Sequence, residues 1–114
     1  MQRHHRLTGN ARILEIHQNG RSAANRLLVL RLSANGLDRS RFCFVASKRV
    51  GNAVVRNRIK RRLREAVRLT DCEPGWDAII MARKDAGAAD YGALERAAHN
   101  LMRRTNLMAT GSKP

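Results

Sequence analysis

The chain has 114 residues, which is enough for one compact domain with a modest core and too few for two. Its 23 Lys and Arg residues outnumber its 9 Asp and Glu residues, so the formal net charge is +14. A charge this positive indicates an anionic partner, namely nucleic acid, an anionic membrane surface or an acidic protein.

The N-terminal region predicts a short helix after a basic, mobile start at residues 1–8. Asn10 is a suitable cap for a helix over residues 11–18. Ile13, Leu14 and His17 would lie on one side of that helix. The Asn-Gly pair that follows would end it.

Two strands are predicted next. Residues 26–34 form an apolar run with leucines on one face. In residues 41–47, Cys43 alternates with Phe42 and Phe44, as in a packed strand. The turn signal at residues 35–40 predicts that the two strands form an antiparallel hairpin with a loop longer than two residues. Cys43 and Cys72 form no C-x-x-C pair, so we expect reduced thiols and no zinc site.

The second half of the chain predicts helix, strand and helix. Asn52 caps a helix over residues 53–69, and residues 76–83 are apolar enough for a central strand. Asp90 caps a last helix over residues 91–104. The order αββαβα predicts an α+β two-layer sandwich of helices against a small sheet, with a frayed tail after the last helix.

The helix over residues 53–69 combines an apolar stripe with a cationic face. Nine Lys or Arg and a single acid, Glu65, lie between Lys48 and Arg68. At helical spacing the apolar stripe consists of Val55, Ile59, Leu63, Ala66 and Val67. A disordered basic tail lacks such a stripe, and an ordinary exposed helix carries more acids for i,i+4 pairs. A solvated face without a partner is the alternative to a polyanion-binding face.

The residue types favour RNA as the polyanion. Arginine outnumbers lysine on this helix. A guanidinium group forms bidentate hydrogen bonds to phosphate and can stack on bases. A membrane-surface helix needs bulkier apolar side chains than Val and Ile. The four aromatic residues are expected in the core, which leaves no stacking platform for single strands: Phe42, Phe44, Trp76 and Tyr91. Recognition by charge and shape suits a folded RNA.

The segment KRVGNAVVRNRIKRRLREAVR, residues 48–68, closely resembles the signature of the bacterial ribonuclease P protein component. Residues 20–32, 74–83 and 90–104 resemble further segments of that family in the same order and spacing. The resemblance implies a single ribonuclease P protein domain over residues 1–114, with an ordered core over about 6–105. It also implies a mixed sheet with an unusual left-handed β-α-β crossover, against the usual right-handed rule.

The resemblance implies the protein subunit of ribonuclease P, which binds the catalytic RNA subunit and the 5′ leader of precursor tRNA. The subunit assists endonucleolytic removal of that leader to give the mature tRNA 5′ end. The RNA supplies catalysis and holds most of the Mg²⁺, so the protein has no catalytic residue or metal site of its own and is inactive alone. We expect one protein per RNA, no DNA or membrane partner, and a cytoplasmic location, because the chain shows no signal peptide or membrane span.

The resemblance assigns two groups of site residues. Contacts to the ribozyme RNA are expected from Lys48, Arg49, Asn52, Arg56, Asn57, Arg58, Lys60, Arg61, Arg64 and Arg68. A cleft between the first helix and the sheet would hold the leader, with Ile13, His17 and Arg31 at positions where the family often has aromatics. We therefore expect leader contact to be more electrostatic and more sensitive to salt.

Two other classes of function stay open from the sequence. A general basic RNA-binding protein, of the ribosomal or chaperone type, would share the composition without the signature segment. A protein-only nuclease would need acids at the spacing of a metal pair, and the nine acids are scattered.

Overall fold

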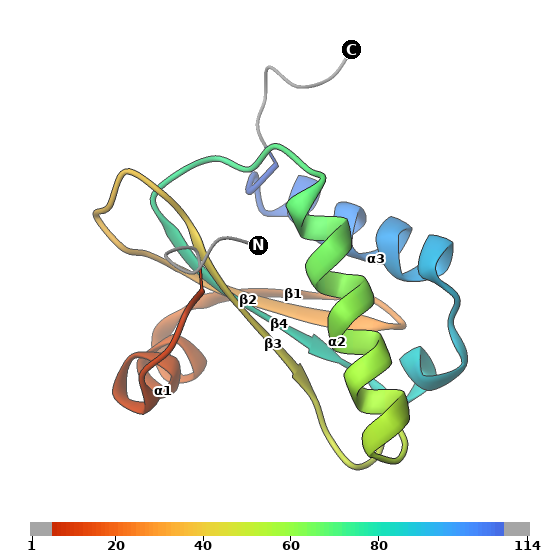
Figure 1. Ribbon diagram of the computed structural model, residues 1–114. Helices are drawn as coiled ribbons and strands as arrows, with labels where there is room; N and C mark the ends of the chain where they lie inside the picture. Colours follow the sequence, from red (N-terminus) through yellow and green to blue (C-terminus); the bar gives the residue numbers. More distant parts are fainter. Residues whose placement is uncertain (1–5, 109–114) are drawn as a thin grey trace.

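A computed structural model describes residues 6–108 as a four-stranded sheet flanked by helices (Figure 1). Its elements in chain order are α1 (Asn10–Asn19), β1 (Arg21–Ala24), β2 (Leu28–Ala34), β3 (Arg41–Ala46), α2 (Ala53–Arg68), β4 (Trp76–Ala82), the 3-10 helix η2 (Lys84–Ala88) and α3 (Tyr91–Arg104). The α+β class is confirmed. The predicted order lacks strand β1. This strand is short and its sequence has no alternation of apolar and polar residues from which a strand could be predicted.

The sheet is mixed, with strand order β1-β2-β4-β3. Strand β4 lies in the centre, antiparallel to β2 and parallel to β3. The predicted hairpin of β2 and β3 is therefore wrong, since β4 separates the two strands and β2 forms its hairpin with β1. The reason is burial: β4 is buried along nearly its whole length, so it takes a position with a neighbour on each side.

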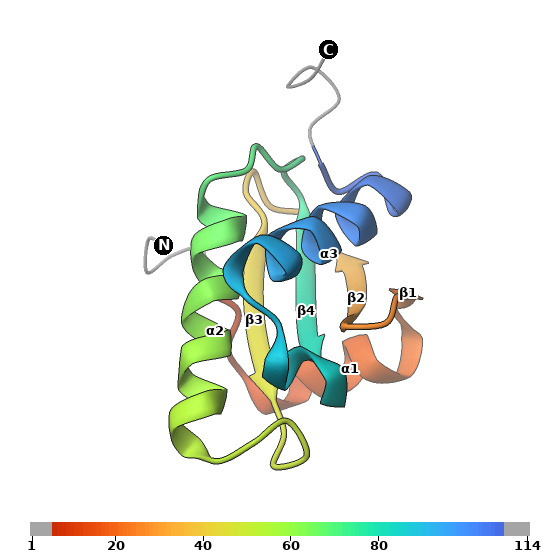
Figure 2. The same cartoon turned by 90° about the vertical axis from the view of Figure 1, so that its right-hand side faces the viewer.

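The path from β3 to β4 runs through α2, which returns the chain so that the two strands are parallel. The predicted handedness of this crossover stays a prediction. Helices α2 and α3 cover one face of the sheet, and α1 lies on the other (Figures 1 and 2).

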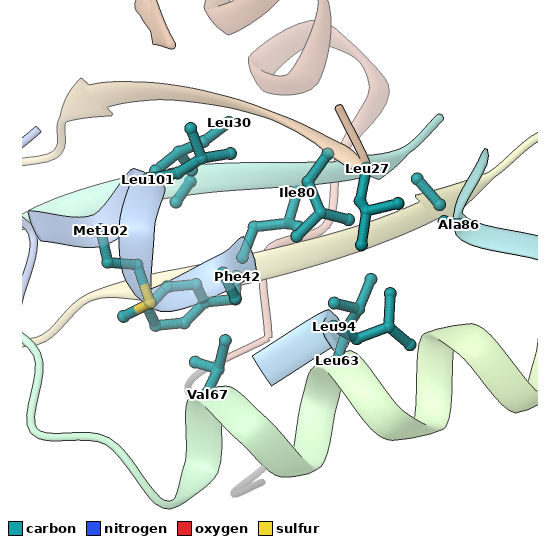
Figure 3. Packing of buried hydrophobic residues seen from close by; sticks show 14 of the residues in the cluster. Leu27, Leu30, Phe42, Leu63, Val67, Ile80, Ala86, Leu94, Leu101 and Met102 are labelled. Atoms are coloured by element: carbon teal, nitrogen blue, oxygen red, sulfur yellow. The ribbon is translucent and has the colours of Figure 1, made fainter. Parts of the chain in front are cut away.

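The main core lies between the sheet and the α2–α3 layer. Leu28, Leu30 and Leu32 of β2 are fully buried there, as the alternation in the sequence predicts. Figure 3 shows side chains of α2 and α3 meeting those of the sheet, with Val67 next to the ring of Phe42. A second, smaller cluster of Leu7, Ile16 and Ile79 fixes α1 on the opposite face.

The caps of α2 and α3 are confirmed. Asn52 Oδ1 accepts a hydrogen bond from the Val55 N–H at 3.0 Å, and Asp90 Oδ1 accepts one from the Ala93 N–H at 2.8 Å. The start of α1 differs from the prediction, because Gly9 stands at the cap position and Asn10 is already helical.

The buried face of α1 also differs from the prediction. Leu14 is 56% exposed, whereas Ile16 is fully buried against the sheet. Ile13 and His17 are half-buried on either side of that contact. The helix is short and packs on the small cluster through Ile16, with Ile13 beside it.

Both ends of the described chain are well packed. Leu7 is buried, and its N–H donates to the Phe42 carbonyl at 2.8 Å. Thr105 and Leu107 are buried, and the Leu107 carbonyl accepts from the Glu73 N–H at 2.8 Å. The expected mobility of residues 1–8 and fraying of 105–114 stay predictions, and residues 1–5 and 109–114 lie outside the described residues.

Candidate nucleic-acid interface

Helix α2 begins at a tight turn that sets its position on the sheet. A Cβ atom at Gly51 would lie only 2.8 Å from Val55 Cγ1, so this position needs glycine. Asn52 then caps the helix through its side chain. The two residues turn the chain from β3 into α2 within a few residues, so that Lys48 and Arg49 stay exposed beside the helix start.

The apolar stripe of α2 is buried as predicted. The residues that face the core are Ile59, Leu63, Ala66 and Val67. Val55 is half-buried at the N-terminal end of the stripe. All ten residues assigned to ribozyme contact keep some exposure. Those exposed are Lys48, Arg49, Asn52, Asn57, Arg61 and Arg68, and those half-buried are Arg56, Arg58, Lys60 and Arg64.

The positive charge of α2 is almost unopposed. Within residues 6–108, the only ion pair formed by α2 joins Arg68 Nη2 to Glu65 Oε2 at 2.6 Å. The hydrogen bond from Arg68 lowers the pKa of Glu65, which keeps this carboxylate ionised. The buried Nε atoms of Arg56 and Arg58 have no hydrogen-bond partner among the described residues. Crowded guanidinium groups of this kind favour a polyanion that neutralises them.

Arg62 of α2 makes a hydrogen bond to another part of the protein. Its Nη1 donates to the Ala89 carbonyl at 3.2 Å, just before α3 begins. Arg62 is not among the predicted RNA contacts, and in the structure it ties α2 to the link between η2 and α3.

The residues predicted for a leader cleft meet between α1 and the sheet. Arg31 Nη1 on β2 donates to the His17 carbonyl at 3.4 Å, so these two residues lie together. Arg31 Nε is buried without a hydrogen-bond partner among the described residues. Ile13 packs against the small cluster under α1. Arg31 therefore contacts the backbone of His17, and a leader cleft at this place stays a prediction.

A buried carboxylate that the sequence analysis did not single out holds α1 in place. Asp77 on β4 accepts hydrogen bonds from Arg12 of α1, from Arg41 of β3 and from Asn35. Burial opposes ionisation of Asp77, but the hydrogen bonds from Arg41, Asn35 and Arg12 outweigh it and lower the pKa to about 2. The only signal in the sequence is an acid inside an apolar strand.

The aromatic residues are less uniformly buried than predicted. Phe42 is buried, but Phe44, Trp76 and Tyr91 are half-buried. Arg21 lies over the ring of Trp76 and Arg64 over that of Phe44, at 5.2 Å and 6.0 Å from the ring centroids. Two of the rings therefore lie within reach of cationic side chains.

Across residues 6–108, no group of three or more His, Cys, Asp or Glu side chains is placed to hold a metal ion. The helices described in this range include none that is long and apolar enough to cross a membrane.

Comparisons with known proteins agree with this arrangement. The family model described as ribonuclease P matches residues 1–106. The ribonuclease P protein component of Alkaliphilus metalliredigens is 35% identical over 111 residues, which cover 96% of this chain and 100% of that protein. The corresponding protein of Dehalococcoides mccartyi is 33% identical over 113 residues, which cover 99% and 94%.

Solved structures show the same fold. The RNase P protein of Staphylococcus aureus superposes with a TM-score of 0.83 at 30% identity, over 91% of this chain and 97% of that one. The RNase P protein of Thermotoga maritima superposes with a TM-score of 0.80 at 30% identity, over 87% and 96%. These likenesses favour the specific family over a general basic RNA-binding protein. The chain belongs to the ribonuclease P protein family, as the protein component of the ribonucleoprotein that cleaves tRNA precursors.

Proposed function

We propose that the outward face of α2 binds the RNA subunit of ribonuclease P. The observation that carries this proposal is a cationic helix face with one acid, docked on the sheet by a buried apolar stripe. The proposed contacts are Lys48, Arg49, Asn52, Arg56, Asn57, Arg58, Lys60, Arg61, Arg64 and Arg68. Phosphate groups would replace solvent around the guanidinium groups and release counterions, which makes assembly sensitive to salt.

The cleft between α1 and the sheet is proposed to hold the 5′ leader of precursor tRNA. Support comes from Arg31, whose Nε is buried without a partner while its Nη1 reaches the His17 carbonyl. Because Arg31 is only half-buried, a leader phosphate would be attracted by the positive charge of its guanidinium. Ile13 would give apolar contact but no ring for a base to stack on, so leader contact is more electrostatic than with aromatic residues.

The remaining assignments follow from the same proposal. Mg²⁺ is held mainly by the RNA subunit, which supplies the catalytic groups, and the protein contributes positive charge and position. One protein binds one RNA, as a single domain over residues 1–114 with an ordered core over about 6–105, in the cytoplasm where precursor tRNA is processed.

Cleavage of precursor tRNA at low Mg²⁺ tests the proposed function. Three reactions are compared: the protein alone, ribonuclease P RNA alone, and both together. We expect cleavage at the mature 5′ end only when both are present, because the protein neutralises phosphate repulsion that Mg²⁺ otherwise screens. Absence of stimulation with the cognate RNA would refute the cofactor role, and cleavage by protein alone would refute catalysis by RNA.

A further inference from the structure

A groove of about 400 Å³ lies beside α2 at the edge of the sheet. We call it the edge pocket; it is lined by Arg6, Leu7, residues 42–44, Lys60 and Arg64. Its walls come from three separate parts of the chain: the segment before α1, strand β3 and the side of α2 next to β3. A cavity of this volume falls in the range of small-ligand sites.

The floor of the edge pocket is aromatic. The rings of Phe42 and Phe44 are nearly parallel, with an interplanar angle of 14° and centroids 6.3 Å apart. Phe42 is buried in the core, but Phe44 is only half-buried. Phe44 therefore presents part of its ring to the pocket, where a planar group can stack on it.

The walls of the edge pocket are cationic. Lys60 and Arg64 stand one helical turn apart on α2, and Arg6 faces them from the N-terminal segment. Arg64 Cζ lies over the Phe44 ring, 6.0 Å from its centroid, so a ligand stacked on this ring would also contact the guanidinium. No acidic side chain is among the described residues that line the pocket. An aromatic floor between cations fits a ligand that is planar and carries a negative charge.

The strand edge adds backbone groups to the same site. Strand β3 lies at the edge of the sheet, and its Phe42 carbonyl points outward to accept the Leu7 N–H at 2.8 Å. Backbone direction alternates along a strand, so the N–H and C=O of Phe44 point to the same side, just past the end of this contact. They give the pocket one donor and one acceptor that can pair with the edge of a base.

We propose that the edge pocket binds one unpaired nucleotide of the ribonuclease P RNA. Its base stacks on Phe44, and its phosphate lies among Arg6, Lys60 and Arg64. A base inside a duplex is stacked on its neighbours and cannot enter, so the pocket selects a bulged or looped-out residue. This inference rests on the proposed function and deepens it, because it gives two of the ten proposed contacts, Lys60 and Arg64, a specific nucleotide whose base stacks on Phe44.

The test compares Phe44→Leu with Arg61→Ala in the full-length protein bound to its ribonuclease P RNA. Phe44→Leu keeps the charge and most of the apolar volume, so we expect affinity to fall at least about five-fold with an unchanged dependence on salt. Arg61 is exposed on the outward face, away from the pocket lining, so Arg61→Ala should make the salt dependence shallower. An effect of Arg61→Ala alone overturns the edge pocket, whereas no effect of either variant overturns the proposed function of α2.

Chemical probing of bases identifies the nucleotide directly. We expect the wild-type protein to protect one unpaired base of the RNA subunit, and Phe44→Leu to restore its reactivity. Arg64→Gln, which leaves the core untouched, should restore the same reactivity and covers the case in which Phe44→Leu fails to fold. Probing is repeated with precursor tRNA present. The proposal is overturned if the protein protects only bases of the tRNA leader. It is also overturned if both variants protect the same bases as the wild-type protein.

Discussion

The Nε atom of Arg12 lies 2.8 Å from Oδ2 of Asp77, so α1 is tied to the central strand of the sheet by a buried carboxylate. Arg41 Nη2 reaches the same oxygen at 2.7 Å, and Asn35 Nδ2 donates to Oδ1 at 2.9 Å. The Asp77 side chain is 0% exposed, whereas both arginines reach solvent. Because α1 forms one wall of the proposed leader cleft, this cluster sets the geometry of a site it does not line.

Asp77→Asn should destabilise the fold strongly. The substitution removes the buried anion that Arg12 and Arg41 share, and breaking a buried pair costs about 3–5 kcal/mol. We expect about 3 kcal/mol, near the low end, since both guanidinium groups can turn to water. The free energy of unfolding in urea measures the loss.

The matched control for this prediction is Glu15→Gln. Glu15 also pairs with Arg12, at 2.9 Å, but its side chain is 58% exposed. Exposed pairs contribute little, so the control should change stability by less than about 1 kcal/mol. Equal losses in the two variants would contradict the role given to burial of Asp77.

The same carboxylate predicts how stability depends on pH. Its pKa is lowered from 3.8 to about 2 in the folded protein, so the unfolded chain takes up the proton at higher pH. The contribution of Asp77 is therefore complete above about pH 5 and is lost as the pH falls through 4 toward 2, amounting to roughly 2 kcal/mol.

Unfolding measured between pH 2 and pH 7 checks this dependence. Other carboxylates titrate in the same range, so the quantity to compare is the difference between the wild-type protein and Asp77→Asn. That difference should shrink as the pH falls. A side-chain carboxyl NMR signal of Asp77 that titrates near pH 4 would show that its ion pairs do not favour the charged form.

The sequence predicts the elements that carry their own local signals. The caps at Asn52 and Asp90 define two helices to within one residue, and the spacing of apolar residues gives the buried stripe of α2. These features depend on neighbours along the chain, so a single sequence contains them. The family signature around Arg56 and Arg58 adds the functional assignment of the same helix.

Pairing of strands was predicted less well because it depends on distant parts of the chain. The two strands β2 and β3 are close in sequence and separated by a turn, yet β4 inserts between them. The ion pairs of Asp77 are not predictable from the sequence for a related reason. Its partners Arg12 and Arg41 lie 65 and 36 positions away along the chain. Phe44 was assigned wholly to the core because periodicity cannot show that β3 is an edge strand.

Leu63→Ala should act through the fold and not through RNA contact. Leu63 is 0% exposed in the main core, so truncation should cost about 2–5 kcal/mol. Val54, on the same helix, is 71% exposed, and Val54→Ala should change stability by less than about 0.5 kcal/mol. Thermal or urea unfolding gives both values. Below the unfolding transition, the salt dependence of RNA binding should be unchanged by Leu63→Ala, and a shallower slope would contradict the assignment.

Arg61→Ala and Arg62→Ala should have different effects, although the two residues are adjacent. Arg61 is expected to contact RNA, whereas Arg62 contacts the protein itself. Arg61 is exposed, so its loss should reduce the slope of log affinity against log salt by about one unit for the phosphate it contacts. Arg62 donates to the Ala89 carbonyl, so its loss should lower stability by about 1 kcal/mol and leave the slope unchanged. Binding to ribonuclease P RNA over a range of monovalent salt, with unfolding measured in parallel, distinguishes the two. If both variants had the slope of the wild-type protein, neither side chain would contact a phosphate.

Arg31→Gln should weaken the contact with the leader and remove much of its salt dependence. Arg31 Nη1 keeps the guanidinium beside the His17 carbonyl, and the side chain is only half-buried, so its charge can attract a leader phosphate. Glutamine retains a donor for His17 but carries no charge, so affinity of the assembled enzyme for precursor tRNA should fall several-fold, as expected for a charge-assisted hydrogen bond. The control is precursor tRNA with a leader too short to reach the cleft, for which both proteins should bind alike. If wild-type affinity for the long leader barely changed with salt, the cleft would not act through charge, and Ile13 and the surrounding apolar surface would have to carry the contact.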